Sequence, residues 1–246
     1  MPHPAIPVVD FAGVVFHSLR GQGVLVTGGA SGIGADIVRG FAAQGCRVGF
    51  VDRDAVAGQA LADALENVFF AACDVTDVPA LRQAITMLTT KLDGVDVLVN
   101  NVANDDRHAI EDVTPEYFDE RVAINFRPHF FATQAVLPGM RERGGGAIVN
   151  MGSASWKIKG SGYAVYASCK SAMLGFTRVL AGELGRDNIR VNCVVPGWVM
   201  TERQVSLWLD SQGERELDRN QCLGGRLADT ARMITAQEFV VDAGWC

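Results

Sequence analysis

The segment GVLVTGGASGIG, residues 23–34, joins a short apolar run to a glycine-rich loop. Its first five residues predict a β-strand. The residues after the loop, 33–44, have the apolar spacing of an amphipathic helix, and a glycine at position 45 is suited to end it. Glycines between a strand and a helix let the backbone approach a pyrophosphate, which then sits at the helix N-terminus. The segment therefore predicts a dinucleotide site, with the spacing Gly-x-x-x-Gly-x-Gly in place of Gly-x-Gly-x-x-Gly.

The alternation of strand and helix continues along the chain. Further strands are expected at residues 47–51, 68–72, 95–99, 147–151, 189–195 and 238–241. Helices are expected at residues 55–65, 78–92, 117–122, 130–141 and 163–184. The strand expected at 95–99 is apolar except for Asp96, and its run 97–99 has the character of strands buried on both faces of a parallel sheet. Strand–helix units with right-handed crossovers predict an α/β fold, a single doubly wound Rossmann-type parallel sheet with helices on both faces.

Composition and charge set further limits. The 246 residues are 48% hydrophobic, enough for a sizeable core, and we expect one domain with an N-terminal extension at 1–20 and a substrate loop or lid at about 197–226. A net charge of −6 argues against a nucleic-acid or anionic-membrane partner. Six scattered cysteines without a Cys-x-x-Cys pair indicate neither a disulfide framework nor a metal site, and favour the reducing cytoplasm. No apolar run reaches the ~18 residues of a membrane helix, and residues 1–20 lack the basic start of a signal peptide.

Polar residues gather at the carboxyl ends of the expected strands, where ligands bind in such sheets. Asp52 ends the second strand, where a carboxylate accepts both hydroxyls of an adenosine ribose and repels a 2′-phosphate. This favours NAD over NADP, although the neighbouring Arg53 is a residue that can accept a 2′-phosphate. Other strand ends carry Asp74, Asn101 and Ser153.

Tyr166 and Lys170 form the only Tyr-x-x-x-Lys in the chain and share one face of the expected helix. A lysine ammonium beside a phenol favours the phenolate and lowers the tyrosine pKa from about 10. Such a phenol is a usable proton carrier near neutral pH. The spacing by itself also fits a solvated helix face, so its interpretation depends on the nucleotide motif upstream.

Several motifs taken together resemble the short-chain dehydrogenase/reductase family, from about Ser18 to Trp245. They are Thr27–Gly34, Asn100-Asn101, Asn125, Ser153, Tyr166 with Lys170, and Pro196-Gly197. The segments 104–108, 119–121, 144–146 and 241–245 look like the branch that oxidises aldoses at C1, which includes bacterial D-xylose and L-arabinose 1-dehydrogenases. The resemblance implies an NAD-dependent oxidoreductase that turns a pyranose into a lactone, and a homo-oligomer, a tetramer or a dimer.

The resemblance also implies a role for individual residues. Tyr166 is the general base, and Lys170 holds the nicotinamide ribose and lowers the Tyr166 pKa. Ser153 hydrogen-bonds the reacting oxygen, and Asn125 positions a water that leads from Lys170 to solvent. The implied cofactor-binding residues are Gly28, Ser31, Gly32, Ile33, Gly34, Asp52, Arg53, Asp74, Val75, Asn101, Tyr166, Lys170, Pro196, Gly197, Val199 and Thr201.

A sugar needs convergent hydrogen-bonding groups and often an aromatic face. The expected substrate-binding residues are Asn104, Ser153, Ser155, Trp156, Tyr166, Trp198 and Arg203, with Asp105 as a further candidate beside Asn104. Residues 204–220 are expected to form a mobile lid helix. The polar run at 104–108 fits a solvated loop equally well, and Trp156 also fits a core position.

Two departures from the family pattern leave other functions open. Val102-Ala103 stands where the family usually has Ala-Gly, and the segment 227–235 is too short for the usual helix. They motivate a catalytically impaired nucleotide-binding protein as one alternative. The other alternative is an enzyme of the same family that acts on a non-sugar alcohol or a 3-oxoacyl thioester.

Overall fold

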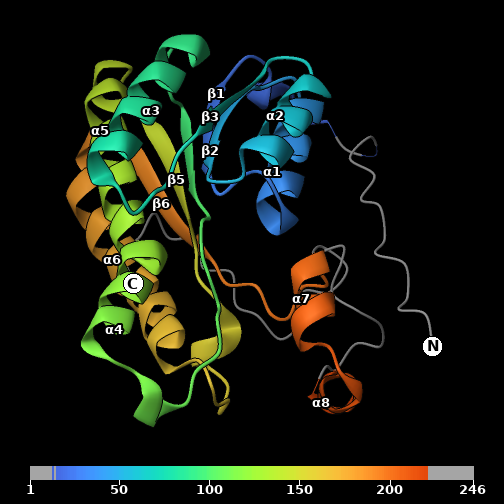
Figure 1. Ribbon diagram of the computed structural model, residues 1–246. Coiled ribbons are helices and arrows are strands. Elements are labelled where there is room, and N and C mark those ends of the chain that lie inside the picture. Colours follow the sequence, from blue (N-terminus) through green and yellow to red (C-terminus); the bar gives the residue numbers. More distant parts are fainter. Residues whose placement is uncertain (1–12, 14, 221–246) are drawn as a thin grey trace.

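The computed structural model describes residue 13 and residues 15–220 of the chain (Figure 1). Six parallel strands form one sheet in the order β3-β2-β1-β4-β5-β6. They are β1 (Gly23–Thr27), β2 (Arg47–Asp52), β3 (Val68–Ala72), β4 (Val97–Asn100), β5 (Gly146–Met151) and β6 (Ile189–Val194). The strand order reverses between β1 and β4, which opens a crevice at the carboxyl ends of these two strands.

Helices cover both faces of this sheet. The helices of the described residues are α1 (Gly32–Ala43), α2 (Ala55–Asp63), α3 (Val78–Leu92), α4 (Pro115–Asn125), α5 (Arg127–Glu142), α6 (Ala164–Leu184), α7 (Glu202–Trp208) and α8 (Ser211–Asn220). Short 3₁₀ turns lie at η1 (His17–Leu19), η2 (Ile110–Asp112), η3 (Ala154–Trp156) and η4 (Gly185–Asp187). Figure 1 shows α1 and α2 on one face and α3, α5 and α6 on the other, while α7 and α8 stand apart from the sheet. The predicted doubly wound Rossmann-type fold is confirmed.

The central strands are buried on both faces, as their sequences predict. In β1, Leu25 belongs to the apolar cluster under α3, α5 and α6, whereas Val24 and Val26 belong to the cluster under α1 and α2. All three side chains are 0% exposed, so the glycine loop emerges from a fully buried central strand. At about 25 cal/mol per Å² of buried apolar area, two such layers supply most of the stability of the sheet.

The expected strands lie within two residues of the observed ones, but the substrate lid differs from its prediction. The prediction of a single helix at 204–220 is wrong, because the structure has two helices, α7 and α8, with a break at Leu209 and Asp210. The Asp210 carboxylate accepts a hydrogen bond from Gly213 N at 2.8 Å and so caps a new helix, while Leu209 turns inward to pack in an apolar cluster with Leu217.

Several predictions fall outside the described residues: the strand at 238–241, the short segment at 227–235 and most of the extension at 1–20. Within the described part of the chain, no helix combines the length and apolar character needed to cross a membrane.

Candidate active site

The glycine loop is shaped by contacts that only glycine tolerates. Gly28 has φ +70°, and a Cβ placed on it would lie 2.8 Å from Val102 Cα. A Cβ on Gly34 would overlap the Gly28 carbonyl oxygen and lie 2.6 Å from Asn101 Nδ2. The loop is therefore a close-packed cradle at the start of α1, where backbone N–H groups favour a phosphate. The bulkier Val102, a departure from the family pattern, packs directly against this cradle.

Two side chains hold the cradle in place. Asn101 donates from Nδ2 to the carbonyls of Thr27 at 3.1 Å and Gly28 at 2.8 Å. Asp52 accepts from Ala30 N and, with its other oxygen, from Asp54 N, each at 3.0 Å. The Asp52 carboxylate thus stands at the end of β2 beside the loop, where it fits the ribose of a nicotinamide dinucleotide. Arg53, next to it, is exposed.

Other expected cofactor residues border the same crevice. Asp74 and Val75 follow β3, and a backbone hydrogen bond from Thr76 holds the pKa of Asp74 below its ordinary value. Thr201 lies close to the glycine loop: a Cβ placed on Gly32 would be 3.3 Å from Thr201 Cγ2. The segment 196–201 therefore reaches the glycine loop and borders one side of the crevice.

Ser153, Tyr166 and Lys170 lie together beyond β5. Ser153 is hydrogen-bonded to the Tyr166 phenol and also accepts from Ser155 N at 3.1 Å. Lys170 is 2% exposed, donates from Nζ to Met151 O at 2.8 Å, and lies 5.9 Å from the centre of the Tyr166 ring. The end of β5 and one face of α6 thus bring a hydroxyl, a phenol and an ammonium into one site.

The pKa values of the phenol and the ammonium are both set mainly by burial. Burial raises the pKa of Tyr166, against the lowering effect of the hydrogen bond from Ser153. Burial also lowers the pKa of Lys170 from 10.5 to about 8. Burial is thus the largest influence on the Tyr166 pKa, and the lowering expected from Lys170 stays a prediction.

Asn125 is completely buried at the break between α4 and α5. Its Oδ1 accepts from Asn104 N at 2.8 Å, and its Nδ2 donates to Arg121 O at 3.0 Å. The amide thereby fixes the loop after β4 to the helix break. His129, one turn later, is also 0% exposed, and burial beside Lys170 holds its pKa well below the ordinary value. Sequence reasoning missed His129, which lies just before the helix expected at 130–141; its place four residues after Asn125 was the available signal.

A polar network joins the loop after β4 to α7. Arg203 Nε lies 3.2 Å from Asp105 Oδ1, and its NH2 lies 2.6 Å from Asp106 Oδ1. Gln204 Nε2 donates to Asp105 Oδ2 at 2.7 Å. Buried Arg121 binds the other oxygen of Asp106 at 2.9 Å. Of these residues, Asp105 and Arg203 were expected to supply hydrogen bonds to a sugar.

The C-terminal end of α7, at Trp208, contacts the same loop through Arg107. The Arg107 guanidinium lies 4.6 Å from the centre of the Tyr163 ring and 4.9 Å from that of Trp208, within range of cation–π attraction. The loop at 104–108 is therefore bound to α7 at both ends and is not a solvated loop.

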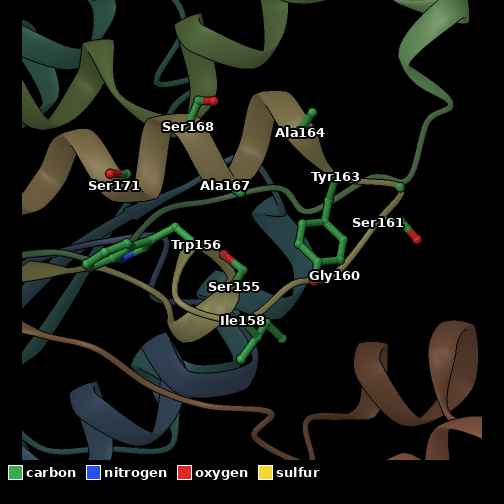
Figure 2. A pocket seen from close by; sticks show the side chains of 11 residues that line it. Ser155, Trp156, Ile158, Gly160, Ser161, Tyr163, Ala164, Ala167, Ser168 and Ser171 are labelled. Carbon is green, nitrogen blue, oxygen red and sulfur yellow. The ribbon is translucent and has the colours of Figure 1, made fainter.

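Ser155 and Trp156 follow Ser153 in the chain, and the backbone N–H of Ser155 donates to Ser153 Oγ. They line a pocket of about 330 Å³ together with residues 158, 160–164, 167, 168 and 171, and Figure 2 shows Tyr163 and Ile158 bordering it. Trp198 packs in an apolar cluster with Met200, Leu209 and Leu217. The substrate-binding role expected for these three residues stays a prediction.

Known proteins resemble this chain over nearly its whole length. The model of the short chain dehydrogenase family matches residues 22–212. The D-xylose 1-dehydrogenase of Caulobacter vibrioides is 43% identical over 248 residues, covering 94% of this chain and 98% of that protein. A probable galactose dehydrogenase of Rhizobium meliloti is 42% identical over 247 residues, covering 93% and 96%. The crystal structure of a 3-ketoacyl-(acyl-carrier-protein) reductase from Brucella melitensis with NADH is similar at a TM-score of 0.78 and 27% identity, covering 87% and 89% of the two chains.

Proposed function

Because this chain belongs to the short-chain dehydrogenase family, we propose that it oxidises an aldose at C1 with NAD as acceptor. It is an oxidoreductase that acts on CH–OH groups. The proposed substrate is a pentose such as xylose or arabinose, or galactose, and the proposed product is the lactone. The observation that carries the proposal is the full-length similarity to two sugar dehydrogenases at 42–43% identity.

The chemistry follows from the arrangement of three side chains. The C1 hydroxyl of the sugar binds between the Ser153 hydroxyl and the Tyr166 phenol, which are hydrogen-bonded to each other. Tyr166 takes the hydroxyl proton as the C1–H bond breaks, and Ser153 holds the reacting oxygen in place. When bound, NAD⁺ supplies the acceptor for the hydride. Lys170 places a positive charge near the phenol, which favours the phenolate, and Asn125 fixes the loop that borders the site.

The choice of NAD over NADP rests on Asp52. Its carboxylate stands at the end of β2, already bonded to the backbone of the glycine loop. A 2′-phosphate placed there would meet a negative charge at close range, whereas a free ribose would find a hydrogen-bond acceptor.

The proposed setting is a homo-oligomer, a tetramer or a dimer, in the cytoplasm. The four cysteines in the described residues are all free thiols, which suits a reducing compartment. Apolar side chains on α5 and α6 are exposed, among them Phe130 at 47% and Val179 at 60%, and a second subunit would cover such groups.

A substrate scan tests the proposal. Purified protein is incubated with NAD⁺ and each of a panel of aldopentoses and aldohexoses, and reduced cofactor is followed by absorbance at neutral and mildly alkaline pH. We expect turnover of at least one aldose, with a lactone identified by mass spectrometry before it hydrolyses. No turnover of any aldose would contradict the proposal, and activity confined to non-sugar alcohols or 3-oxoacyl thioesters would establish the alternative function.

A further inference from the structure

The Asp105 carboxylate lies in the loop after β4, where Arg203 and Gln204 of α7 hold it. It follows β4 by only a few residues, next to Asn104, whose backbone N–H is bound by Asn125. Burial raises the pKa of Tyr166, and the Asp105 carboxylate raises it further, so its charge acts on the phenol. The Asp105 side chain is 17% exposed.

The bonding capacity of this carboxylate is only half used. An ionised carboxylate can accept about four hydrogen bonds, two on each oxygen. In the structure, Oδ1 accepts from Arg203 and Oδ2 accepts from Gln204. Each oxygen can therefore accept one further hydrogen bond. The side chains of Arg203 and Gln204 fix the orientation of the carboxylate.

Asp106 provides a contrast within the same loop. Its two oxygens bind two arginines, Arg203 at 2.6 Å and Arg121 at 2.9 Å. Against the effect of burial, these arginines hold the pKa of Asp106 below its ordinary value. Asp106 thus links α4 to α7 and has no effect on Tyr166 comparable to that of Asp105.

A negative charge near a phenol that must lose its proton works against the proposed oxidation, so a structural role alone does not explain why Asp105 is kept there. Neighbouring hydroxyls of a pyranose are pairs of O–H donors, and an oriented carboxylate with one free position on each oxygen is their complement. Hydrogen bonds of this kind to an ionised acceptor are about twice as strong as neutral ones.

We infer that Asp105 is a specificity-determining residue that binds hydroxyl groups of the sugar away from C1, and that Arg203 and Gln204 orient it. The inference rests on the proposed function and adds the group that distinguishes a polyol from a simple alcohol. Substrates that lack those hydroxyls leave the two remaining acceptor positions of the carboxylate unfilled and bind less tightly, because they displace water from these positions without replacing its hydrogen bonds.

The test compares Asp105→Asn with Asp106→Asn in the full chain. Asparagine keeps the size of aspartate at both positions, and both changes weaken the contact to Arg203 equally in number. With the aldose that the scan finds best, Asp105→Asn should raise KM about 10- to 100-fold, since it removes charge-assisted hydrogen bonds, while Asp106→Asn should change KM less than about threefold. Calorimetric titration of the sugar into each protein with NADH gives the loss of affinity independently of turnover.

Deoxy sugars identify the contact itself. The 2-, 3- and 4-deoxy forms of the best aldose are each assayed with wild type and Asp105→Asn. For at least one deoxy sugar the wild type should already show the raised KM, and the variant should add little to it, because both changes remove the same bond. Thermal unfolding and NADH binding are measured on each variant to verify that it is folded.

Three results decide the matter. A rise in KM that is confined to Asp105→Asn, and that one deoxy sugar reproduces in the wild type, supports the inference. Equal effects of the two variants, or the same added loss for every deoxy sugar, would overturn it and leave the proposed function standing. Absence of turnover with all aldoses would overturn the proposed function and this inference together.

Discussion

Replacing Lys170 with methionine is expected to yield a more stable protein without activity. Lys170 is 2% exposed, and burial lowers its pKa from 10.5 to about 8. That difference of about 2.5 pH units means that holding the ammonium inside the fold costs about 3 kcal/mol at pH 7. Methionine has a similar length and no charge, but it gives up the hydrogen bond to Met151 O, worth about 1 kcal/mol. The net gain is about 2 kcal/mol.

The pH dependence gives this prediction a definite sign. The folded pKa lies below the unfolded one, so between pH 8 and 10.5 the unfolded chain binds more protons at this position and wild-type stability rises with pH. Below pH 8 the full penalty is present, and above 10.5 it is gone. The advantage of Lys170→Met should therefore shrink as the pH rises and be close to zero near pH 9.5.

Thermal unfolding of ligand-free protein at pH 7 and pH 9.5 measures the effect. For a chain of this size, about 2 kcal/mol corresponds to a rise in Tm of about 4–8 °C at pH 7. Lys159→Met, a change at an exposed lysine, is the matched control and should leave Tm unchanged at both pH values. A variant that is less stable than wild type at pH 7, or equally shifted at both pH values, would refute the assigned burial penalty.

Three further substitutions test the site. Tyr166→Phe removes only the phenol oxygen and should lower kcat by at least about 1000-fold with NADH affinity, measured by calorimetry, nearly unchanged; retained turnover would remove Tyr166 from the mechanism. Asp52→Ala removes the acceptor at the end of β2 and should shift the ratio of kcat/KM values toward NADP by at least about tenfold, and an unchanged ratio would show that Asp52 does not discriminate the ribose. Gly34→Ala places a methyl group against the Gly28 carbonyl and should weaken NADH binding by more than about tenfold, whereas Gly139→Ala, which meets open space, should not.

The elements of the fold could be predicted because their signals are local. The largely apolar strand at 95–99 and the glycine loop at 23–34 each carry their pattern within a dozen residues, and the observed sheet agrees with both. The division of the lid into two helices was missed, since it depends on Leu209 finding an apolar partner in Leu217. A single amphipathic pattern over 204–220 does not reveal which way such a residue turns.

The polar network was less accessible to sequence reasoning. The Arg203–Asp105 and Arg203–Asp106 pairs join residues 98 and 97 positions apart, and no periodicity connects them. The buried Arg121 is equally hidden, because an arginine on a helix is usually exposed. Only the three-dimensional arrangement shows that the loop at 104–108 is bound at both ends and presents Asp105 to the site.

The pKa shifts of Tyr166 and Lys170 also explain why a Tyr-x-x-x-Lys spacing does not by itself establish a proton carrier. Burial raises the pKa of Tyr166 and lowers that of Lys170 to about 8, so at neutral pH the phenol keeps its proton while the ammonium keeps its charge. Each shift is the response of a group to the loss of water, and the attraction between them is too weak to reverse it. A proton can leave the phenol readily only when more positive charge enters the site, and oxidised nicotinamide carries such a charge. Burial thus opposes the charged form of both groups, and the phenolate that the proposed base catalysis needs is expected to form when positive charge is added to the site.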